Sequence, residues 1–473
     1  MRQIPLEVLQ YPLIEAIARR RTRRVARGVS IAAGPLSHTS TNAPAPLDPL
    51  EEAILIVATG LTGVVTHDGP LDMPDGGKEL GTPFLHVMGR AASSPDNIQA
   101  VRMIMINDAG TWLIERLPPA KTIEMLGALP PRWSEWSGDD WLAVAKAVKT
   151  RIGNRLEFPR RFPFYLGWNK QLSNVPGTTM FLPIVDCTRG YITALLNLAM
   201  EPDGQRPLFM DDWRCFHPKT PFDFVASAAS KLGMVQLPYQ LVGGVKHVRS
   251  KYVNPALAAP LGMFRTFLAD HEAHFHLQNL MLLTQAMGLG GWVHFCPPSP
   301  FLFEGDGTPE CKGLGFRMEK PKKKKWFGDP PPPPSWLPNP VGIPGVLEAN
   351  TPPFVKDMDE AVDNVLEAKF GKGGAYDAAL LARGYADSKS AAEYLKRADR
   401  YDERAVAYVK EICNYIYNTY GRFPAHVDAF YVPGTWLQVS HPELEYYERT
   451  VPPEMIARQK EHARIWQEGD ASR

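Results

Sequence analysis

The amino-acid sequence predicts an α+β fold, because stretches with helical periodicity alternate with short apolar strands. Residues 138–153 and 403–420 repeat apolar side chains at helical spacing. Residues 101–106 form an almost continuous apolar strand, and the turn at 107–110 closes a hairpin to residues 111–114.

The composition is that of a soluble globular protein, with 44% hydrophobic and 22% charged residues. A chain of 473 residues exceeds one typical core, so we expect a large domain with an extension, or two or three domains. The net charge of +1 argues against a protein that binds nucleic acid or another polyanion over its whole surface. Five scattered cysteines without a CxxC pair indicate a reducing compartment. Without a signal peptide or an 18-residue apolar run, the sequence predicts a cytoplasmic protein that does not enter a membrane.

Residues 6–20 have helical periodicity and lead into an arginine-rich stretch. That stretch contains Arg20, Arg21, Thr22 and Arg24. Forked guanidinium groups give bidentate contacts to a phosphate, and the Thr22 hydroxyl adds a donor. A solvated surface or a nucleic-acid arm explains such a charge block equally well on chemical grounds.

Two later helices have recognisable starts. Asp48 is placed as an N-cap with Pro49 at the first helical position, and Glu51 and Glu52 suit the positive end of that helix. Ser137 is placed as the N-cap of the helix that begins at residue 138. We therefore expect both helices to begin at these caps.

A third helix, at residues 279–287, ends in the turn Gly288, Leu289, Gly290 and Gly291 before a strand at 292–296. Glycine has no Cβ and tolerates positive φ, so a ligand or another segment can approach its backbone closely. Taken alone, such a turn is more often purely structural.

Three short elements, in this order, resemble signatures of the nitroreductase-like FMN oxidoreductases: R-x-S-x-R, S-x-x-N-x-Q, and a late helix that ends in G-L-G. The matching positions are Arg20, Thr22 and Arg24, then Ser94, Asn97 and Gln99, and then residues 278–291. The resemblance covers roughly residues 10–320. The chain departs from the pattern at Thr22, which replaces the usual serine, and at Ala100 and Val101, where the family often has Pro-Trp.

The resemblance implies a three-layer α-β-α core with a mixed, largely antiparallel sheet. It implies an obligate homodimer in which two subunits share each FMN, and chemistry centred on the flavin rather than on a catalytic side chain. The reaction would carry hydride or electrons from NAD(P)H to a nitro, quinone, enone or related acceptor. The implied cofactor-binding residues are Arg20, Arg21, Thr22, Arg24, Ser94, Asn97, Gln99, Gly288, Leu289, Gly290, Gly291 and Arg317.

The domain organisation that follows is a flavin-binding domain at 1–320, a Lys/Pro-rich connector at 321–345, and a mainly helical extension at 346–473. The extension is also consistent with a second function, that of a flavin-fold binding or scaffold protein without redox turnover. A third possibility is an atypical member that acts on flavin itself or on a biosynthetic intermediate.

Two groups of histidines invite a metal interpretation. His271, His274 and His276 do not have the HExxH spacing that places two ligands on one helix face. His426 and His441 lie in stretches whose spacing gives no geometric support for a shared site. The sequence therefore predicts no metal site.

Overall fold

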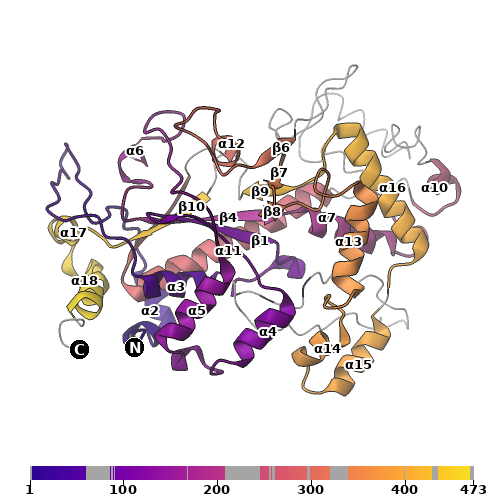
Figure 1. The fold of residues 1–473 in the computed structure, drawn as a ribbon, viewed down its shortest axis with the longest axis horizontal. Helices are drawn as coiled ribbons and strands as arrows, with labels where there is room; N and C mark the ends of the chain where they lie inside the picture. The colour runs from indigo at the N-terminus through magenta and orange to yellow at the C-terminus, as the bar shows by residue number, and fades with distance from the viewer. Residues whose placement is uncertain are drawn as a thin grey trace.

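The computed structural model describes residues 3–59, 86, 89, 91–167, 169–207, 245–254, 257, 261–295, 299–319, 339–398, 400–428 and 435–468. A seven-stranded sheet crosses the middle of the molecule in the order β3-β2-β1-β4-β10-β5, with β9 paired to β4 (Figure 1). Its strands are β1 (Val101–Asn107), β2 (Gly110–Ile114), β3 (Lys149–Gly153), β4 (Thr179–Asp186), β5 (Gly290–Phe295), β9 (His426–Asp428) and β10 (Thr435–Ser440). The neighbouring strands are antiparallel throughout.

Helices surround this sheet and give the molecule a mixed α and antiparallel β architecture, compatible with the predicted α+β class (Figure 1). They are α1 (Leu6–Leu9), α2 (Leu13–Arg19), α3 (Pro49–Ala58), α4 (Pro119–Gly127), α5 (Gly138–Val148), α6 (Asn169–Leu172), α7 (Thr188–Ala199), α10 (Val245–Arg249), α11 (Leu261–Met287), α12 (Ser299–Phe303), α13 (Met358–Phe370), α14 (Ala378–Leu381), α15 (Ser388–Arg397), α16 (Glu403–Tyr420), α17 (Leu444–Thr450) and α18 (Ala457–Ala463). None of these helices is long and apolar enough to cross a membrane. A second sheet contains β6 (Arg317–Glu319), β7 (Asn339–Ile343) and β8 (Leu347–Glu348).

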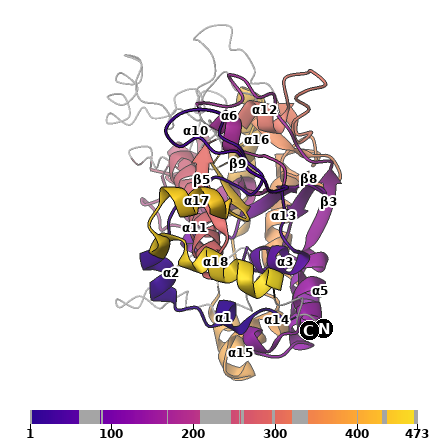
Figure 2. The ribbon, with the colours of Figure 1, turned by 90° about the vertical axis from the view of Figure 1, so that its left-hand side faces the viewer.

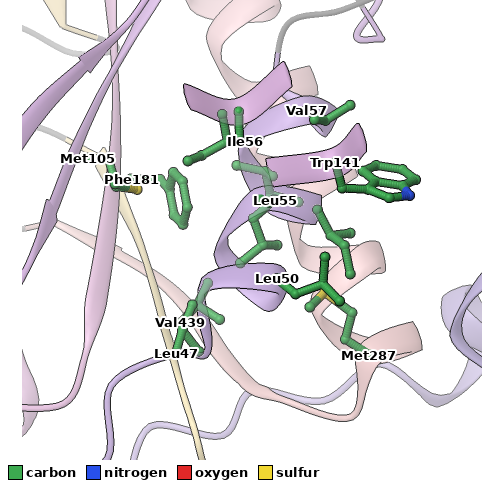
Figure 3. Close-up of a cluster of buried hydrophobic side chains, with 14 of the residues drawn as sticks. Leu47, Leu50, Leu55, Ile56, Val57, Met105, Trp141, Phe181, Met287 and Val439 are labelled. Atoms are coloured by element: carbon green, nitrogen blue, oxygen red, sulfur yellow. The ribbon is translucent and has the colours of Figure 1, made fainter. Parts of the chain in front are cut away.

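The two faces of the large sheet carry alternate residues of each strand and have different covers. One face packs against α3, α5 and α11, and Figure 3 shows Met105 and Phe181 of the sheet directed toward Leu55 and Ile56 of α3. The other face packs largely against an irregular aromatic segment at residues 156–165 and against α12. This arrangement does not confirm the three-layer core that the resemblance implies.

The local signals at 48–58 and 137–148 are confirmed. The Asp48 side chain accepts a hydrogen bond from the backbone N of Leu50 at 2.9 Å, at the start of α3. The Ser137 Oγ accepts one from the backbone N of Asp140 at 3.2 Å, at the start of α5. The predicted hairpin forms between β1 and β2. The helix predicted to reach residue 153 ends at Val148, because the next five residues pair with β2 as strand β3.

The predicted helix at 6–20 is two short helices, α1 and α2, separated at Pro12. Proline has no N–H for a helical hydrogen bond, so it begins the second helix instead of continuing the first. The large apolar side chains of α2 do not enter the core, because Leu13, Ile14 and Ile17 are 65%, 69% and 53% exposed, whereas the small Ala16 is buried.

The segment 346–473 is not a separate extension, and this part of the predicted domain organisation needs correction. Its strand β10 lies between β4 and β5, where Leu437 pairs with both Phe181 and Val293. Its helices α13 and α16 share one apolar cluster with α7. Both contacts bury surfaces that the first 320 residues would otherwise leave open. Most of the predicted connector, residues 321–338, lies outside the described residues, and residues 339–343 form β7.

Candidate functional site

The arginine-rich stretch follows α2 and lies near the surface. Arg20 and Arg24 are half-buried, and Thr22 is exposed. Arg21 donates from Nη1 to the backbone oxygens of Ala18 at 3.1 Å and Arg20 at 2.9 Å, so it caps its own helix. Of the predicted residues in this stretch, Arg21 is thus held by the end of α2, and Thr22 is open to solvent.

Arg23 was not among the predicted site residues, yet it is the buried member of the stretch, with 5% exposure. Its backbone N donates to the oxygen of Gly291 at 3.1 Å, and its guanidinium donates to Gln285 Oε1 at 3.2 Å and to the oxygen of Met455. Burial lowers the pKa of Arg23 from its ordinary value. This residue joins the arginine-rich stretch to the glycine turn after α11.

The glycine turn is a Schellman motif that ends α11. Gly288 has a φ of +82°, and the backbone N of Leu289 donates to the oxygen of Thr284 at 3.0 Å. A Cβ at Gly288 would lie 2.6 Å from the oxygen of Arg458 and 2.6 Å from His462 Cβ. The close approach that glycine permits is thus made here by α18.

A cavity of about 340 Å³ lies beside this junction. The guanidiniums of Arg19, Arg23 and Arg458 line it, together with the carboxylates of Glu454 and Glu461 and the amides of Gln285 and Gln459. Arg458 donates from Nε and Nη2 to the oxygen of Ala286, where a cation offsets the negative end of α11, and it also pairs with Glu461. The three arginines exceed the two glutamates by one positive charge, so the lining is weakly cationic.

The second predicted element, residues 94–99, is anchored by Glu272 of α11. Ser94 Oγ donates to Glu272 Oε2 at 2.9 Å and accepts from the backbone N of Gln99 at 2.8 Å. The same carboxylate accepts from the backbone N atoms of Ala100 at 3.2 Å and Val101 at 3.1 Å. The element is therefore held rigidly at the start of β1.

Two amides in this element have unusual backbone and side-chain environments. Asn97 and Gln99 both have a φ of +50°, a region that costs non-glycine residues free energy. Gln99 Nε2 donates to Asn97 Oδ1 at 3.1 Å. Gln99 Oε1 is buried, and within the described part of the chain no donor reaches it. Strain and an unmatched acceptor at one residue indicate a functional constraint.

The structure brings the first and third predicted elements together and leaves the second apart. Arg23 contacts Gln285, and Ser94 contacts Glu272, which precedes Gln285 by 13 residues on α11. At the rise of an α-helix this separation is about 20 Å. Arg317 belongs to neither group: it is exposed on β6, which Figure 1 shows above the sheet while α2 lies below it.

A smaller cavity of about 140 Å³ lies beside the second element and was not predicted. It is lined by Ile98 and Ala100, by the guanidiniums of Arg102, Arg116 and Arg189, and by the carboxylates of Asp186 and Glu348. These arginines lie on or next to β1, β2 and α7, so only the folded chain brings them together. The cavity is below the size of typical cofactor pockets.

Comparison with known proteins adds no assignment to this geometry. No protein-family model matches the chain, and no curated protein matches it. A functional proposal therefore depends on the two regions at α11, the cationic cavity and the strained amides.

Proposed function

We propose that the protein is an FMN-dependent oxidoreductase of the nitroreductase-like type, with each flavin held between two subunits of a homodimer. The observation that carries the proposal is Gln99, a buried residue at positive φ whose Oε1 has no donor within the described part of the chain. A buried acceptor without a partner costs free energy unless a ligand supplies the donor. The N3–H on the polar edge of a flavin is such a donor.

The arginine-rich stretch supports the proposal because it offers donors for the phosphate of FMN, at the opposite end of the cofactor from the polar edge of the ring. Arg20, Thr22 and Arg24 belong to the same stretch as Arg23, which lines a cavity of about 340 Å³, near the lower limit of typical cofactor pockets. Guanidiniums and a hydroxyl donate charge-assisted hydrogen bonds to a phosphate. These residues would hold and neutralise the FMN phosphate.

The distance between the two regions supports a shared site. Within one chain the arginine-rich stretch and Gln99 lie at positions about 20 Å apart along α11. A symmetric dimer in which residues 94–99 of the partner subunit approach Arg20 and Arg24 brings them together. The exposed apolar side chains Leu13 and Ile14, just before Arg20, are surface that such an interface would cover.

The residues of the chain would bind and orient the cofactor, while the redox chemistry would be the cofactor's own. Bound FMN would take hydride from NADH or NADPH and deliver hydride or electrons to a nitro, quinone, enone or related acceptor. Asn97 and Gln99 would fix the polar edge of the ring, and their rigid anchor on Glu272 would limit its movement. We also propose that the fold contains the three-layer α-β-α core of that family.

FMN titration of the full-length protein tests the proposal. The wild type should bind about one FMN per chain, and the R20Q/R24Q double variant should bind at least about 100-fold more weakly, because two charge-assisted contacts are lost. R132Q is the matched control, since the side chain of Arg132 is 80% exposed and pairs only loosely with Glu135 at 3.9 Å. A wild-type protein that takes up no FMN would contradict the proposal.

Anaerobic addition of NADH or NADPH to the loaded protein separates the enzyme from a binding protein. Bleaching of the flavin absorbance, followed by reoxidation with a nitro compound, quinone or enone, is the expected result. Bound flavin that neither nicotinamide reduces would favour a binding or scaffold protein. Reduction without turnover of these acceptors would favour action on flavin itself or on a biosynthetic intermediate.

A further inference from the structure

Three side chains from distant parts of the chain meet below the sheet, away from the amide element. Glu51 lies in the first turn of α3, His441 follows β10, and His462 lies on α18, which Figure 2 shows beside α3. Glu51 Oε1 lies 2.5 Å from His462 Nε2, and Glu51 Oε2 lies 3.0 Å from His441 Nε2. One ligand atom from each residue lies within 4.8 Å of the other two.

The cluster is shielded from solvent. The side chains of Glu51 and His462 are 1% and 3% exposed, and that of His441 is 12% exposed. A carboxylate buried in this way is stabilised only by a positive charge or by several hydrogen-bond donors beside it.

The hydrogen bond at Nδ1 of His441 determines what its Nε2 atom presents to the carboxylate. His441 Nδ1 faces the backbone oxygen of Ala45 at 3.3 Å, which can only accept, so the Nδ1 atom carries a proton. A neutral His441 then presents a lone pair on Nε2 to a carboxylate oxygen, which is repulsive. Either a second proton on the imidazole or a metal cation between these atoms removes the repulsion.

A second buried carboxylate, that of Glu443, differs from Glu51 because neutral hydrogen-bond donors surround it. Glu443 Oε2 accepts from the backbone N of Gly28 at 2.7 Å and from Ser40 Oγ at 2.7 Å, and its Oε1 accepts from Asn42 Nδ2 at 2.7 Å. His38 lies farther away, with Nε2 3.6 Å from Oε1. Neutral donors satisfy Glu443, whereas Glu51 faces two imidazoles.

We propose that Glu51, His441 and His462 bind a divalent transition-metal ion, with zinc as the best match. Two imidazole nitrogens and one carboxylate oxygen are a ligand set of zinc and of other first-row transition metals, whereas calcium and magnesium prefer oxygen ligands alone. The outer contacts also match, because the ligating groups of metal sites are themselves hydrogen-bonded. His441 donates to Ala45, and Glu51 accepts from the backbone N of Asp48 at 2.7 Å.

The geometry requires only a small adjustment to admit the ion. Ligands about 2.0–2.2 Å from a tetrahedral zinc lie about 3.3–3.6 Å from one another. Glu51 Oε1 lies 2.5 Å from His462 Nε2 and 3.3 Å from His441 Nε2, so the shorter of these contacts needs to lengthen by about 1 Å. Three protein ligands leave a fourth position for water or another small ligand.

The site would join the beginning of the chain to its end. Glu51 is in α3, while His441 and His462 belong to the segment after residue 346 that completes the sheet. Metal bound only to the folded chain stabilises it by linkage. This inference does not depend on the flavin proposal, since none of the three residues belongs to the proposed FMN site.

Calorimetric titration of Zn²⁺ into chelator-treated, full-length protein at pH 7.5 tests the site. The wild type should bind one Zn²⁺ per chain and should melt at a higher temperature with Zn²⁺ than without it. E51Q, H441Q and H462Q should each bind about 10–100-fold more weakly or not at all. H294Q is the control, because His294 is also a buried histidine but contacts Ser173 rather than a carboxylate, and its affinity should equal that of the wild type.

X-ray absorption of the zinc-loaded wild type keeps the test decisive if a variant fails to fold. The expected first coordination shell contains nitrogen and oxygen donors with two imidazoles and no sulfur. The proposal is overturned by a wild type that binds no Zn²⁺, by a sulfur-containing shell, or by folded variants that bind as tightly as the wild type. In each of those cases the cluster is a protonated His–Glu–His network.

Discussion

The two regions that α11 supports differ in how completely their polar groups are matched. At its C-terminal end, Gly288 closes a Schellman motif and Arg458 donates to the carbonyl oxygen of Ala286, so helix termination accounts for both residues. Near Glu272, Asn97 and Gln99 keep a positive φ although their segment is anchored. The buried Oε1 atom of Gln99 accepts no hydrogen bond from the described part of the chain. The resemblance implies that the glycine turn binds the cofactor, but packing against α18 explains the turn. The element at residues 94–99 is therefore the better indicator of a ligand.

Replacing Gly288 with alanine should have the largest effect, about 3 kcal/mol or more of unfolding free energy, measured by urea denaturation. The new Cβ would combine a positive φ with overlap of α18, where the nearest atoms are 2.6 Å away. Gly34 is the matched control: its φ is +98°, and nothing described lies within 4 Å of the place that a Cβ would take there, so G34A should cost roughly 1 kcal/mol. Equal losses at both positions would show that α18 does not press on the turn.

Glu272→Gln should destabilise the protein by about 2 kcal/mol, because the amide cannot accept from Ser94 and from the backbone N atoms of residues 100 and 101 as the carboxylate does. E135Q is the control, since the Glu135 side chain is 49% exposed, and it should change the unfolding free energy by less than about 0.5 kcal/mol. A Glu272 variant as stable as this control would mean that the amide element is not anchored through α11.

The pH dependence of stability should report His294, on the strand that follows the glycine turn. Burial lowers the pKa of His294 to about 3, so the folded state keeps it neutral while the unfolded state protonates it below about pH 6.5. The unfolding free energy should therefore fall as the pH drops from 6.5 toward 3, by up to about 1.4 kcal/mol per pH unit. H294Q should lose this part of the slope between pH 6.5 and 4.5. Parallel pH profiles for the two proteins would show that His294 is not held neutral.

Gln99→Gly should have the smallest effect on stability, within about 1 kcal/mol of the wild type in either direction. Glycine relieves the strain at a φ of +50° and removes the buried acceptor, while the contact to Asn97 is lost. FMN affinity should nevertheless fall at least about tenfold. A loss of 3 kcal/mol in unfolding free energy would assign Gln99 to the core instead of the ligand site.

Local signals explain which elements could be predicted. Ser137 and Asp140 form a capping box within four residues, and α5 begins where the sequence predicts it. Asp48 and Glu51 form the same kind of box at α3. The association of Glu51 with His462 depends on residues 411 positions apart, which no local pattern contains.

The remaining differences between prediction and structure have similar long-range causes. β10 has a short strand-like sequence, but its place between β4 and β5 depends on edges formed much earlier in the chain. Arg23 is indistinguishable in the sequence from its neighbouring arginines, and only contacts with α11 and with Met455, in the turn before α18, bury it. The prediction therefore assigned the site residues to one site because their motifs follow one another along the chain. In the fold, these motifs lie at different positions along α11.

Subunit exchange between two inactive variants tests the shared flavin site most directly. Chains carrying R20Q/R24Q are mixed in equal amounts with chains carrying Q99G, at an FMN concentration at which neither variant alone retains flavin, and native mass spectrometry confirms the exchange. Half of the dimers are then mixed, and each has one intact site of two, so bound FMN should recover to about a quarter of the wild-type amount. Confirmed exchange with no recovery of bound FMN would contradict a site formed by two subunits.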